Sequence, residues 1–184
     1  MVEHYAAQGK VSRIDGNRPA EAVFADACAA AEVAVRAEVL AANQALLDAI
    51  CGGDWAAYAA AADPGMTCFE PEAAELGCVR GLEFHRAAFE GGARARAEAA
   101  LRGAPAPAWA ASTMQEAEAR LLGPRHALVT YVRATSPLAP GSGSAVVARV
   151  AETRVWRLGE GGRWLLQHVH RSPMPPLLPA GEEA

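Results

Sequence analysis

Several features that would place the chain in a large functional class are missing from it. None of its apolar runs approaches the ~20 residues of a membrane-spanning helix, and its polar N-terminus lacks the hydrophobic segment of a secretory signal. The net charge of −4 gives it none of the basic excess that is typical of nucleic-acid-binding domains. These absences predict a cytoplasmic protein whose partners are neither membranes nor nucleic acids.

Paired cysteines are missing as well. The four cysteines are Cys28, Cys51, Cys68 and Cys78. No two of them have the C-x-x-C spacing of a zinc or redox site, so we interpret them as reduced structural thiols. His168 and His170 fall on one strand face, but no third ligand accompanies them in the pattern. We therefore expect neither a metal nor a cofactor.

What the chain contains is the composition of one globular domain. Hydrophobic residues make up 52% and charged residues 21% of the 184 residues, which is normal for a soluble protein. Residues 1–26 are polar and interrupted by glycine and proline, which predicts a flexible N-terminal extension. Residues 27–173 carry the regular patterns of the domain, and residues 174–184 form a proline-rich tail.

A long helix is predicted from near Ala27 to Cys51. Its apolar residues recur at steps of three and four and build one stripe, which consists of Val35, Val39, Ala42, Leu46 and Ile50. Gly52 and Gly53 follow, as is typical of a helix C-terminus.

Two shorter helices are predicted next. Asp54 is a suitable N-cap for a helix through Ala62, and Asp63-Pro64-Gly65 predicts a turn after it. A third helix is predicted for GLEFHRAAFEGG, with the glycine pair at its end as a stop or kink. The following ARARAEAALRGAPAPAW indicates a frayed helix end and a loop.

The remaining segments alternate as β-strands do. Two short strands are expected at MTCFEPEA and CVRG, and four longer ones at STMQEAEARLL, HALVTYVRAT, SAVVARVAETRVWRL and RWLLQHVHR. Helices first and antiparallel strands after them indicate an α+β fold. In that fold the long N-terminal helix packs on a strongly curved antiparallel sheet and leaves a conical cavity.

Three of the strands place an arginine on a face that also carries large apolar residues. Under the period-two rule the sets are Val129, Tyr131 and Arg133; Val150, Arg154 and Trp156; and Leu165, Val169 and Arg171. Arginine is rarely buried without a partner or a wet cavity. The three sets therefore predict a sheet that curves around a positively charged pocket suited to a carboxylate.

Ion pairs inside the protein are an alternative for each arginine. Glu152 shares the face of the arginine two residues further along, and Glu70 and Glu72 lie on an early strand. A buried pair accounts for a single arginine, whereas a pocket accounts better for all three. Tyr58 and Tyr131 are further candidates for the pocket wall, together with Glu152.

Five segments in a fixed order resemble one known family. They are ANQALLDAICGGDWAAYAAAADPGMTCFEPEA, GLEFHRAAFE, YVRAT, ETRVW and HVHRS. Over residues 34–173 they resemble the association (hub) domain of calcium/calmodulin-dependent protein kinase II. The resemblance implies the cone of the nuclear transport factor 2-like superfamily and a non-catalytic role in self-assembly. Hub domains pair into dimers, and the dimers pack into closed rings that hold many kinases together.

The resemblance also implies a pocket. In hub domains arginines line a deep cavity near a histidine of the third helix, and the motifs assign these roles to Arg133, Arg154, Arg171 and His85. The implied partners are further copies of the chain, full-length kinase subunits, and a small carboxylate or acidic peptide in the pocket. A hydrogen-bonded core histidine explains His85 equally well.

The chain departs from a complete kinase. It has no G-x-G-x-x-G-x-V loop, no H-R-D and no D-F-G, and no basic amphipathic calmodulin target precedes the hub-like part. GGARARAE stands where hub domains usually have an aromatic loop. A second function class stays open, because cone folds also host isomerases, dehydratases and cyclases, here for a small anionic substrate. Carboxylates beside arginines have lowered pKa values and are poor bases, which favours binding over catalysis.

Overall fold

The computed structural model describes residues 2, 6, 11–102, 111–136 and 148–175. Its elements are helix α2 (Ala20–Gly52), helix α3 (Trp55–Ala61), strand β1 (Ala62–Phe69), 3-10 helix η1 (Pro71–Leu76), strand β2 (Val79–Arg80), helix α4 (Glu83–Leu101), and strands β3 (Ala111–Gly123), β4 (His126–Ser136), β5 (Ala148–Leu158) and β6 (Trp164–Pro173). No helix in these residues has both the length and the hydropathy that a membrane span requires. The loop predicted after α4, the start of the strand predicted at SAVV, and most of the predicted tail lie outside the described residues.

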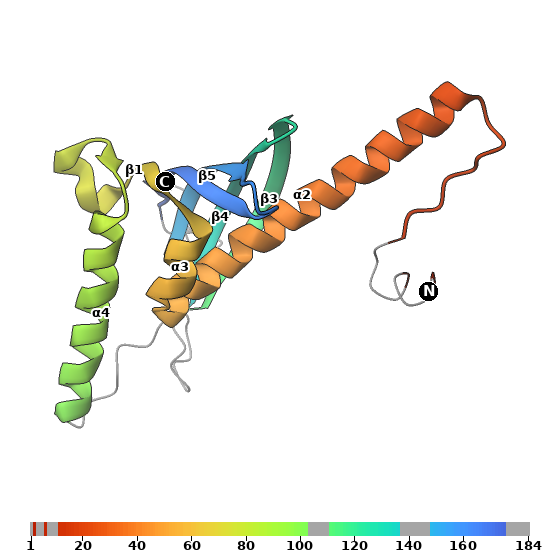
Figure 1. The fold of residues 1–184 in the computed structure, drawn as a ribbon. Helices are drawn as coiled ribbons and strands as arrows, with labels where there is room; N and C mark the ends of the chain where they lie inside the picture. Colours follow the sequence, from red (N-terminus) through yellow and green to blue (C-terminus); the bar gives the residue numbers. More distant parts are fainter. Residues whose placement is uncertain (1, 3–5, 7–10, 103–110, 137–147, 176–184) are drawn as a thin grey trace, which may run out of the picture.

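Six strands form one sheet in the order β2-β1-β6-β5-β4-β3 (Figure 1). Neighbouring strands are antiparallel, except that β1 and β6 are parallel, with Cys68 opposite Val169. A parallel pair requires a long crossover connection, and here the whole chain between β1 and β6 supplies it. The predicted α+β fold with a long helix on a curved sheet is confirmed, and the sheet is mixed at this one pair.

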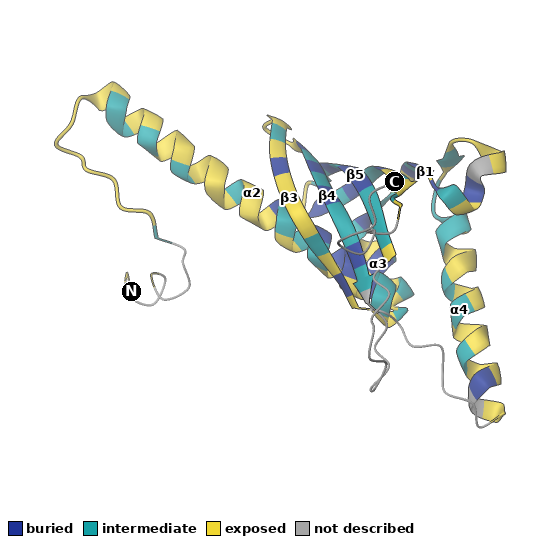
Figure 2. Ribbon diagram, turned by 180° about the vertical axis from the view of Figure 1, so that it is seen from behind, coloured by how far each residue is buried: buried dark blue, intermediate teal, exposed yellow. Residues whose placement is uncertain are grey.

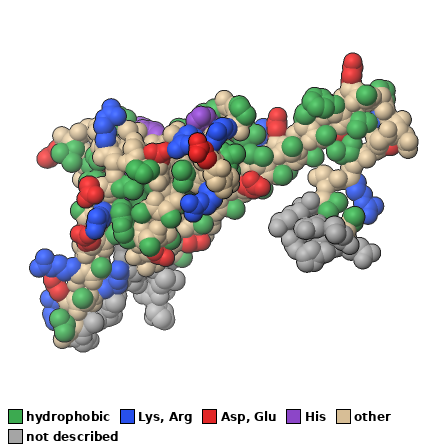
Figure 3. Space-filling model, in the orientation of Figure 1, with side chains coloured by type: hydrophobic (Ala, Val, Ile, Leu, Met, Phe, Trp, Pro, Cys, Tyr) green, Lys and Arg blue, Asp and Glu red, His purple; other side chains and the backbone are tan. Residues whose placement is uncertain are grey.

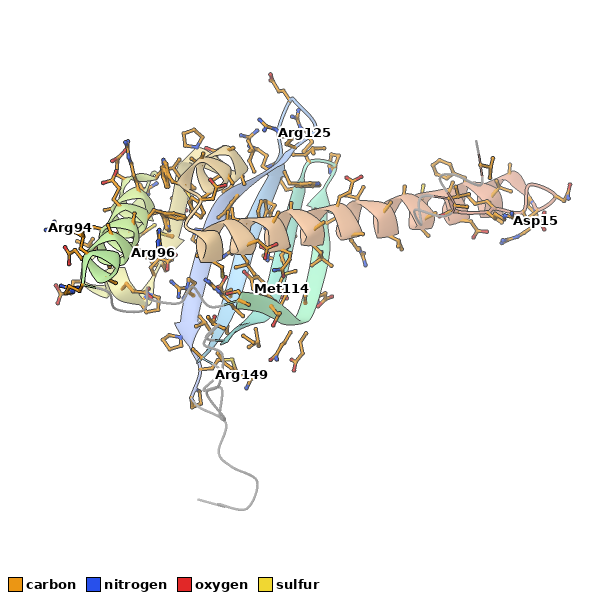
Figure 4. All side chains as sticks on the ribbon, turned by 90° about the horizontal axis from the view of Figure 1, so that it is seen from below. Asp15, Arg94, Arg96, Met114, Arg125 and Arg149 are labelled. Carbon is orange, nitrogen blue, oxygen red and sulfur yellow. The ribbon has the colours of Figure 1, made fainter. Side chains whose placement is uncertain are left out.

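The hydrophobic core lies between α2 and the sheet. Val39, Leu46 and Leu47 of α2 belong to one buried cluster with Val129 of β4 and Trp156 of β5, and each is at most 1% exposed. In Figure 4, α2 crosses the strands of the sheet on one face. Helix α3 contacts β1 and β6 beyond the end of α2, which leaves the open end of the sheet near α4 as the place for a cavity.

Helix α2 is longer than the sequence pattern predicted. It begins at Ala20 instead of near Ala27, because alanine, the strongest helix former, dominates this stretch. Pro19 precedes the first turn, where its missing N–H costs no helix hydrogen bond. Figures 1 and 2 show that the N-terminal half of α2 projects beyond the sheet and is largely exposed. At the other end, Gly53 adopts a φ of 67° and its N–H bonds the carbonyl of Ile50, as predicted.

The junction after α2 contains one confirmed prediction and one wrong one. The Asp54 side chain accepts a hydrogen bond from the N–H of Ala57 at 2.9 Å and so caps α3. Asp63-Pro64-Gly65 does not form a separate turn but lies inside β1, where the register with β6 shifts between Ala62 and Thr67. Proline is tolerated in a strand at such a bulge because no ladder hydrogen bond is lost there.

Segment MTCFEPEA is a strand only in its first half. Strand β1 ends at Phe69, and η1 occupies Pro71–Leu76 in place of further strand. Proline cannot donate to a strand ladder and is well placed at the start of a helix, which explains the change. The predicted strand at CVRG is confirmed as the two-residue β2.

Helix α4 passes Gly91 and Gly92 without a break and ends at Leu101, so the predicted stop or kink is wrong. A side chain on Gly91 would meet nothing within 4 Å, so this glycine has no packing role that would end the helix. Arginine–glutamate pairs at the i,i+4 spacing lie on both sides of the glycines: Arg86–Glu90 and Arg94–Glu98. Such pairs each stabilise a helix by about 0.2–0.5 kcal/mol and partly offset the glycine penalty.

Strand β6 contains a β-bulge that its alternation did not reveal. Leu166 lies opposite the buried Trp156, and the register shifts at Gln167 before the strand continues to Val169. The bulge inserts one residue and reverses the phase of the side chains. Leu165 therefore does not share the face of Val169, and this part of the prediction is wrong.

Candidate functional site

A cavity of about 200 Å³ lies between the start of α4, helix α3 and strands β4 to β6. Every residue that the motifs assigned to a pocket lines it: Arg133, Arg154, Arg171 and His85. Tyr58, proposed as a further wall residue, lines it as well. The arginines come from three adjacent strands, so the sheet itself brings them together.

Glu152 is the centre of the charged network, and its side chain is completely buried. Its Oε2 lies 2.8 Å from Arg154 Nη2, and its Oε1 lies 3.7 Å from Arg133 Nη1 and 3.5 Å from Arg171 Nε. The hydroxyl of Tyr131 donates a hydrogen bond to Oε2. Three guanidinium groups therefore converge on one carboxylate.

The electrostatics of Glu152 are set by two opposing effects. Burial alone would raise its pKa, because a charged carboxylate loses hydration. Arg154, the Tyr131 hydroxyl, Arg133 and Arg171 stabilise the charged form more strongly, so the pKa of Glu152 is lowered. The group stays ionised at neutral pH and balances the fully buried Arg154.

A second carboxylate cluster lies at the mouth of the cavity. Arg171 Nη1 pairs with Glu70, and it lies 3.1 Å from Glu72 Oε2. His85 Nε2 lies 3.3 Å from the other oxygen of Glu70. Burial would raise the pKa of Glu70, but His85 and Arg171 outweigh burial and lower it. The Glu72 side chain, in contrast, is 61% exposed and pairs with Arg171 from the solvent side.

Aromatic rings form a further part of the wall. The Tyr58 ring lies 5.8 Å from Trp55, 5.2 Å from Phe89 and 5.5 Å from His85, measured between ring centroids. Burial raises the pKa of Tyr58 well above its ordinary value, so its hydroxyl stays neutral. The Arg154 guanidinium lies 5.7 Å from the ring centroid of Tyr131, close enough for a cation–π contact.

The structure brings together all seven residues proposed from the sequence, five in the cavity wall and two, Tyr131 and Glu152, directly behind it. It also places the acids of the alternative interpretation within ion-pair distance of the three arginines. Three arginine charges therefore face the three carboxylates of Glu70, Glu72 and Glu152. The arginines therefore both form ion pairs with buried acids and line a cavity in the same site.

Two partners of the arginines were missed. Asn43 of α2 accepts a hydrogen bond from Arg154 at 3.4 Å, and the Ser112 hydroxyl accepts one from Arg133 Nε at 2.9 Å. Asn43 is fully buried. A polar residue between Val39 and Leu46 on the otherwise apolar face of α2 was the signal that could have revealed it.

One group of side chains has the composition of a metal site. Potential ligand atoms of Cys68, Glu70 and His85 lie within 4.8 Å of one another. Glu70 is already engaged by Arg171 and His85. Burial, with Glu70 and Cys78 nearby, raises the pKa of Cys68 to about 11, which favours the thiol over the metal-binding thiolate. His168 is separate from this group, because its Nδ1 lies 2.7 Å from the Thr67 hydroxyl.

The chain is similar to one family over most of its length. The model of the calcium/calmodulin dependent protein kinase II association domain matches residues 35–175. Calcium/calmodulin-dependent protein kinase type II of Caenorhabditis briggsae is 37% identical over 145 residues, and that of Caenorhabditis elegans is 36% identical over 143 residues. These matches cover 78% and 77% of this chain but 24% and 18% of the relatives, so the chain spans about a quarter or less of their length.

Solved structures show the same relationship. The hub homology domain of Chlamydamonas reinhardtii is 40% identical with a TM-score of 0.61, and the match covers 76% of this chain and 98% of that one. The association domain of C. elegans is 35% identical with a TM-score of 0.62, covering 77% and 98%. An NTF2-like protein from Rhodospirillum rubrum, 18% identical with a TM-score of 0.55, covers 74% and 98% and shares the fold. The chain therefore belongs to the family of calcium/calmodulin-dependent protein kinase II association domains and has the nuclear transport factor 2-like fold.

Proposed function

We propose that this chain is a non-catalytic self-assembly domain that forms ring-shaped homo-oligomers built from dimers. The observation that carries the proposal is the extent of the match. The chain aligns with 98% of two solved hub or association domains but with about a quarter or less of two kinase relatives. What it shares with those kinases is the part named for association.

Apolar surface that the single chain leaves exposed supports assembly. Large hydrophobic side chains more than half exposed occur on four separate elements: Phe24 and Val33 on α2, Leu76 on η1, Leu101 on α4 and Leu122 on β3. Single exposed apolar residues are common, but a closed ring requires contacts on more than one side of each subunit. Their distribution around the domain fits that requirement.

The charges of the cavity argue against a carboxylate as the catalytic base of the alternative, a small cone-fold isomerase, dehydratase or cyclase. Such an enzyme needs a base that accepts a proton near neutral pH. Two buried carboxylates of this site have lowered pKa values. His85 and Arg171 stabilise the charge of Glu70, and Arg154, the Tyr131 hydroxyl, Arg133 and Arg171 stabilise the charge of Glu152. These carboxylates accept protons poorly near neutral pH. The charges of the site therefore favour ligand binding over proton transfer by a carboxylate.

The cavity is proposed to accept a small carboxylate or an acidic side chain of a peptide. Arg171 Nε and Glu152 Oε1 are buried and face each other at 3.5 Å as an ion pair without a hydrogen bond, so the inner part of the network is closed. The exposed Glu72 occupies one edge of Arg171 and can be displaced into solvent. An incoming carboxylate would take its place on Arg171 Nη1, which keeps the site charge-balanced. Full-length kinase subunits of the same family are the proposed protein partners.

Native mass spectrometry and light scattering of the purified protein at micromolar concentration test the proposal. The expected result is a closed homo-oligomer much larger than a dimer. A monomer or a plain dimer across that concentration range would refute ring assembly. A mixture with a full-length kinase subunit should give particles of intermediate mass if the two co-assemble.

A further inference from the structure

The projecting part of α2, here named the arm (residues 20–35), lies almost entirely outside the segment that matches the family, which begins at residue 35. It runs for about 24 Å, at 1.5 Å per residue. Its residues are exposed or half-exposed throughout, and the first fully buried position of α2 is Val39. Helices without packing are marginal in water at this length, because tertiary contacts supply most helix stability.

The arm has one half free of charge. At 3.6 residues per turn, nine residues fall on that half: Ala20, Val23, Phe24, Ala27, Cys28, Ala30, Ala31, Ala34 and Val35. The charged residues Glu21, Asp26, Glu32 and Arg36 all fall on the other half. On that half Asp26 pairs with Arg18, and Glu32 pairs with Arg36. Figure 3 shows hydrophobic side chains along the projecting arm.

The same side of α2 continues into a groove on the body of the domain. The groove has a volume of about 440 Å³, and its α2 wall is Glu38, Ala42 and Ala45. On the helix these three lie in line with the uncharged half of the arm. The opposite wall consists of three alanines of α3, at positions 57, 60 and 61, of Gly162 and Arg163 in the β5–β6 turn, and of Trp164 at the start of β6. Alanine walls allow the backbone of another helix to approach closely.

Trp164 forms part of the groove wall on the body of the domain. Its indole lines the groove and is 7% exposed, so the groove offers an aromatic surface beside the alanines.

We infer that the arm of one copy packs in the groove of a second copy, and that the exchange is reciprocal. Arm and groove lie on one side of one helix, so two antiparallel α2 helices related by a two-fold axis place each arm over the other's groove. This self-complementarity is what a two-fold interface requires. With Ala27 opposite Ala42, the axis passes near Ala34 and Ala31 faces Glu38. The inference rests on the proposed self-assembly and names one interface that performs it.

Charge placed on the two halves of the arm tests this interface. The variant Ala27→Glu/Ala31→Glu puts carboxylates on the uncharged half and opposes Glu38. The matched control Ala25→Glu/Ala29→Glu adds the same charge to the other half of the same helix. Native mass spectrometry and light scattering across a dilution series report the result, and circular dichroism checks that each protein is folded.

The first variant should lose the assembled mass or dissociate at a protomer concentration at least tenfold higher, while the control matches the parent. Adding Glu38→Lys to the first variant should restore assembly, because each lysine would face the carboxylate introduced at position 31 of the other copy. Equal assembly of parent, variant and control would overturn the arm interface and leave ring assembly intact. A parent that is monomeric at every concentration would instead overturn the proposed function.

If the first variant does not fold, hydrogen exchange on the parent decides. Arm amides should exchange at least tenfold faster after dilution into the dissociated state than in the assembly. Arm amides that exchange as fast in the assembly as after dilution would contradict the interface.

Discussion

The replacement Glu152→Gln tests the charged network at its centre. It keeps the shape of the side chain but removes the charge that balances three arginines. Arg154 is 2% exposed, so its charge would stay buried with its nearest anion gone. Removing one partner of a buried ion pair costs about 3–5 kcal/mol, because the remaining charge is uncompensated. The amide oxygen of glutamine can still accept from Tyr131, which places the expected loss near the lower end, about 3 kcal/mol.

Thermal unfolding measures this loss. For a domain of this size each kcal/mol shifts Tm by roughly 2–4 °C, so a decrease of about 10 °C is expected at pH 7. The protomer concentration must be fixed, because assembly contributes to apparent stability. The matched control is Glu118→Gln, which removes an exposed carboxylate paired with Arg120 on the surface of β3 and should leave Tm unchanged.

The pH dependence provides a second, independent check. The pKa of Glu152 is lower in the folded chain than its unfolded value of 4.5. Its charge therefore stabilises the fold above about pH 4.5, and this contribution is lost as the pH falls through the lower, folded pKa. The difference in Tm between parent and Glu152→Gln should be constant near neutral pH and should shrink in acid. A variant as stable as the control, or a difference that grows in acid, would refute the role given to Glu152.

Three further outcomes follow from single positions. Arg171→Ala should weaken acetate binding by about 10- to 100-fold, the worth of a charged hydrogen bond, as measured by calorimetry beside Arg80→Ala on β2; unchanged affinity would exclude the cavity as a carboxylate site. Gly91→Ala should raise the free energy of unfolding by about 0.5–1 kcal/mol, because its added methyl group meets nothing in α4, and a decrease in denaturant midpoint would contradict this. Leu46→Ala should lower the free energy of unfolding by about 2–5 kcal/mol, since Leu46 is 1% exposed in the core. A loss below that range would mean that the core collapses into the space left by the leucine side chain.

The alternation of side chains along the strands predicted the arginines of the site, because no bulge interrupts that alternation between the residues concerned. Arg133 and Arg154 lie on strands whose alternation is regular across the pairing of β4 with β5. Val169 and Arg171 lie on one side of the bulge in β6, so their relative phase is correct. Leu165 lies on the other side of the bulge, and the period-two rule fails there. The rule therefore predicts shared faces only between bulges.

Helix lengths were harder to predict, because glycine and alanine act through context. Gly53 ends α2, where a left-handed φ is needed. Gly91 and Gly92 instead lie within α4, where ion pairs on both sides help to stabilise the helix. The alanine-rich start of α2 has strong intrinsic propensity but no stripe that faces the core. The core-facing stripe begins only at Val35, so periodicity did not fix the start of the helix. The predicted start near Ala27 missed the first seven residues of the arm.

The acids of the site depend on a pairing that no local pattern contains. Glu70 follows β1 and Arg171 lies in β6, and only the parallel pairing of these strands brings them together. Glu152 and Arg154, in contrast, are two residues apart on one strand and were recognised as a pair from the sequence. The inner half of the network is thus encoded in one strand, whereas the outer half is created by the fold. Because the outer half includes the exposed Glu72, it is also the half that a ligand can rearrange without uncovering the buried charge of Arg154.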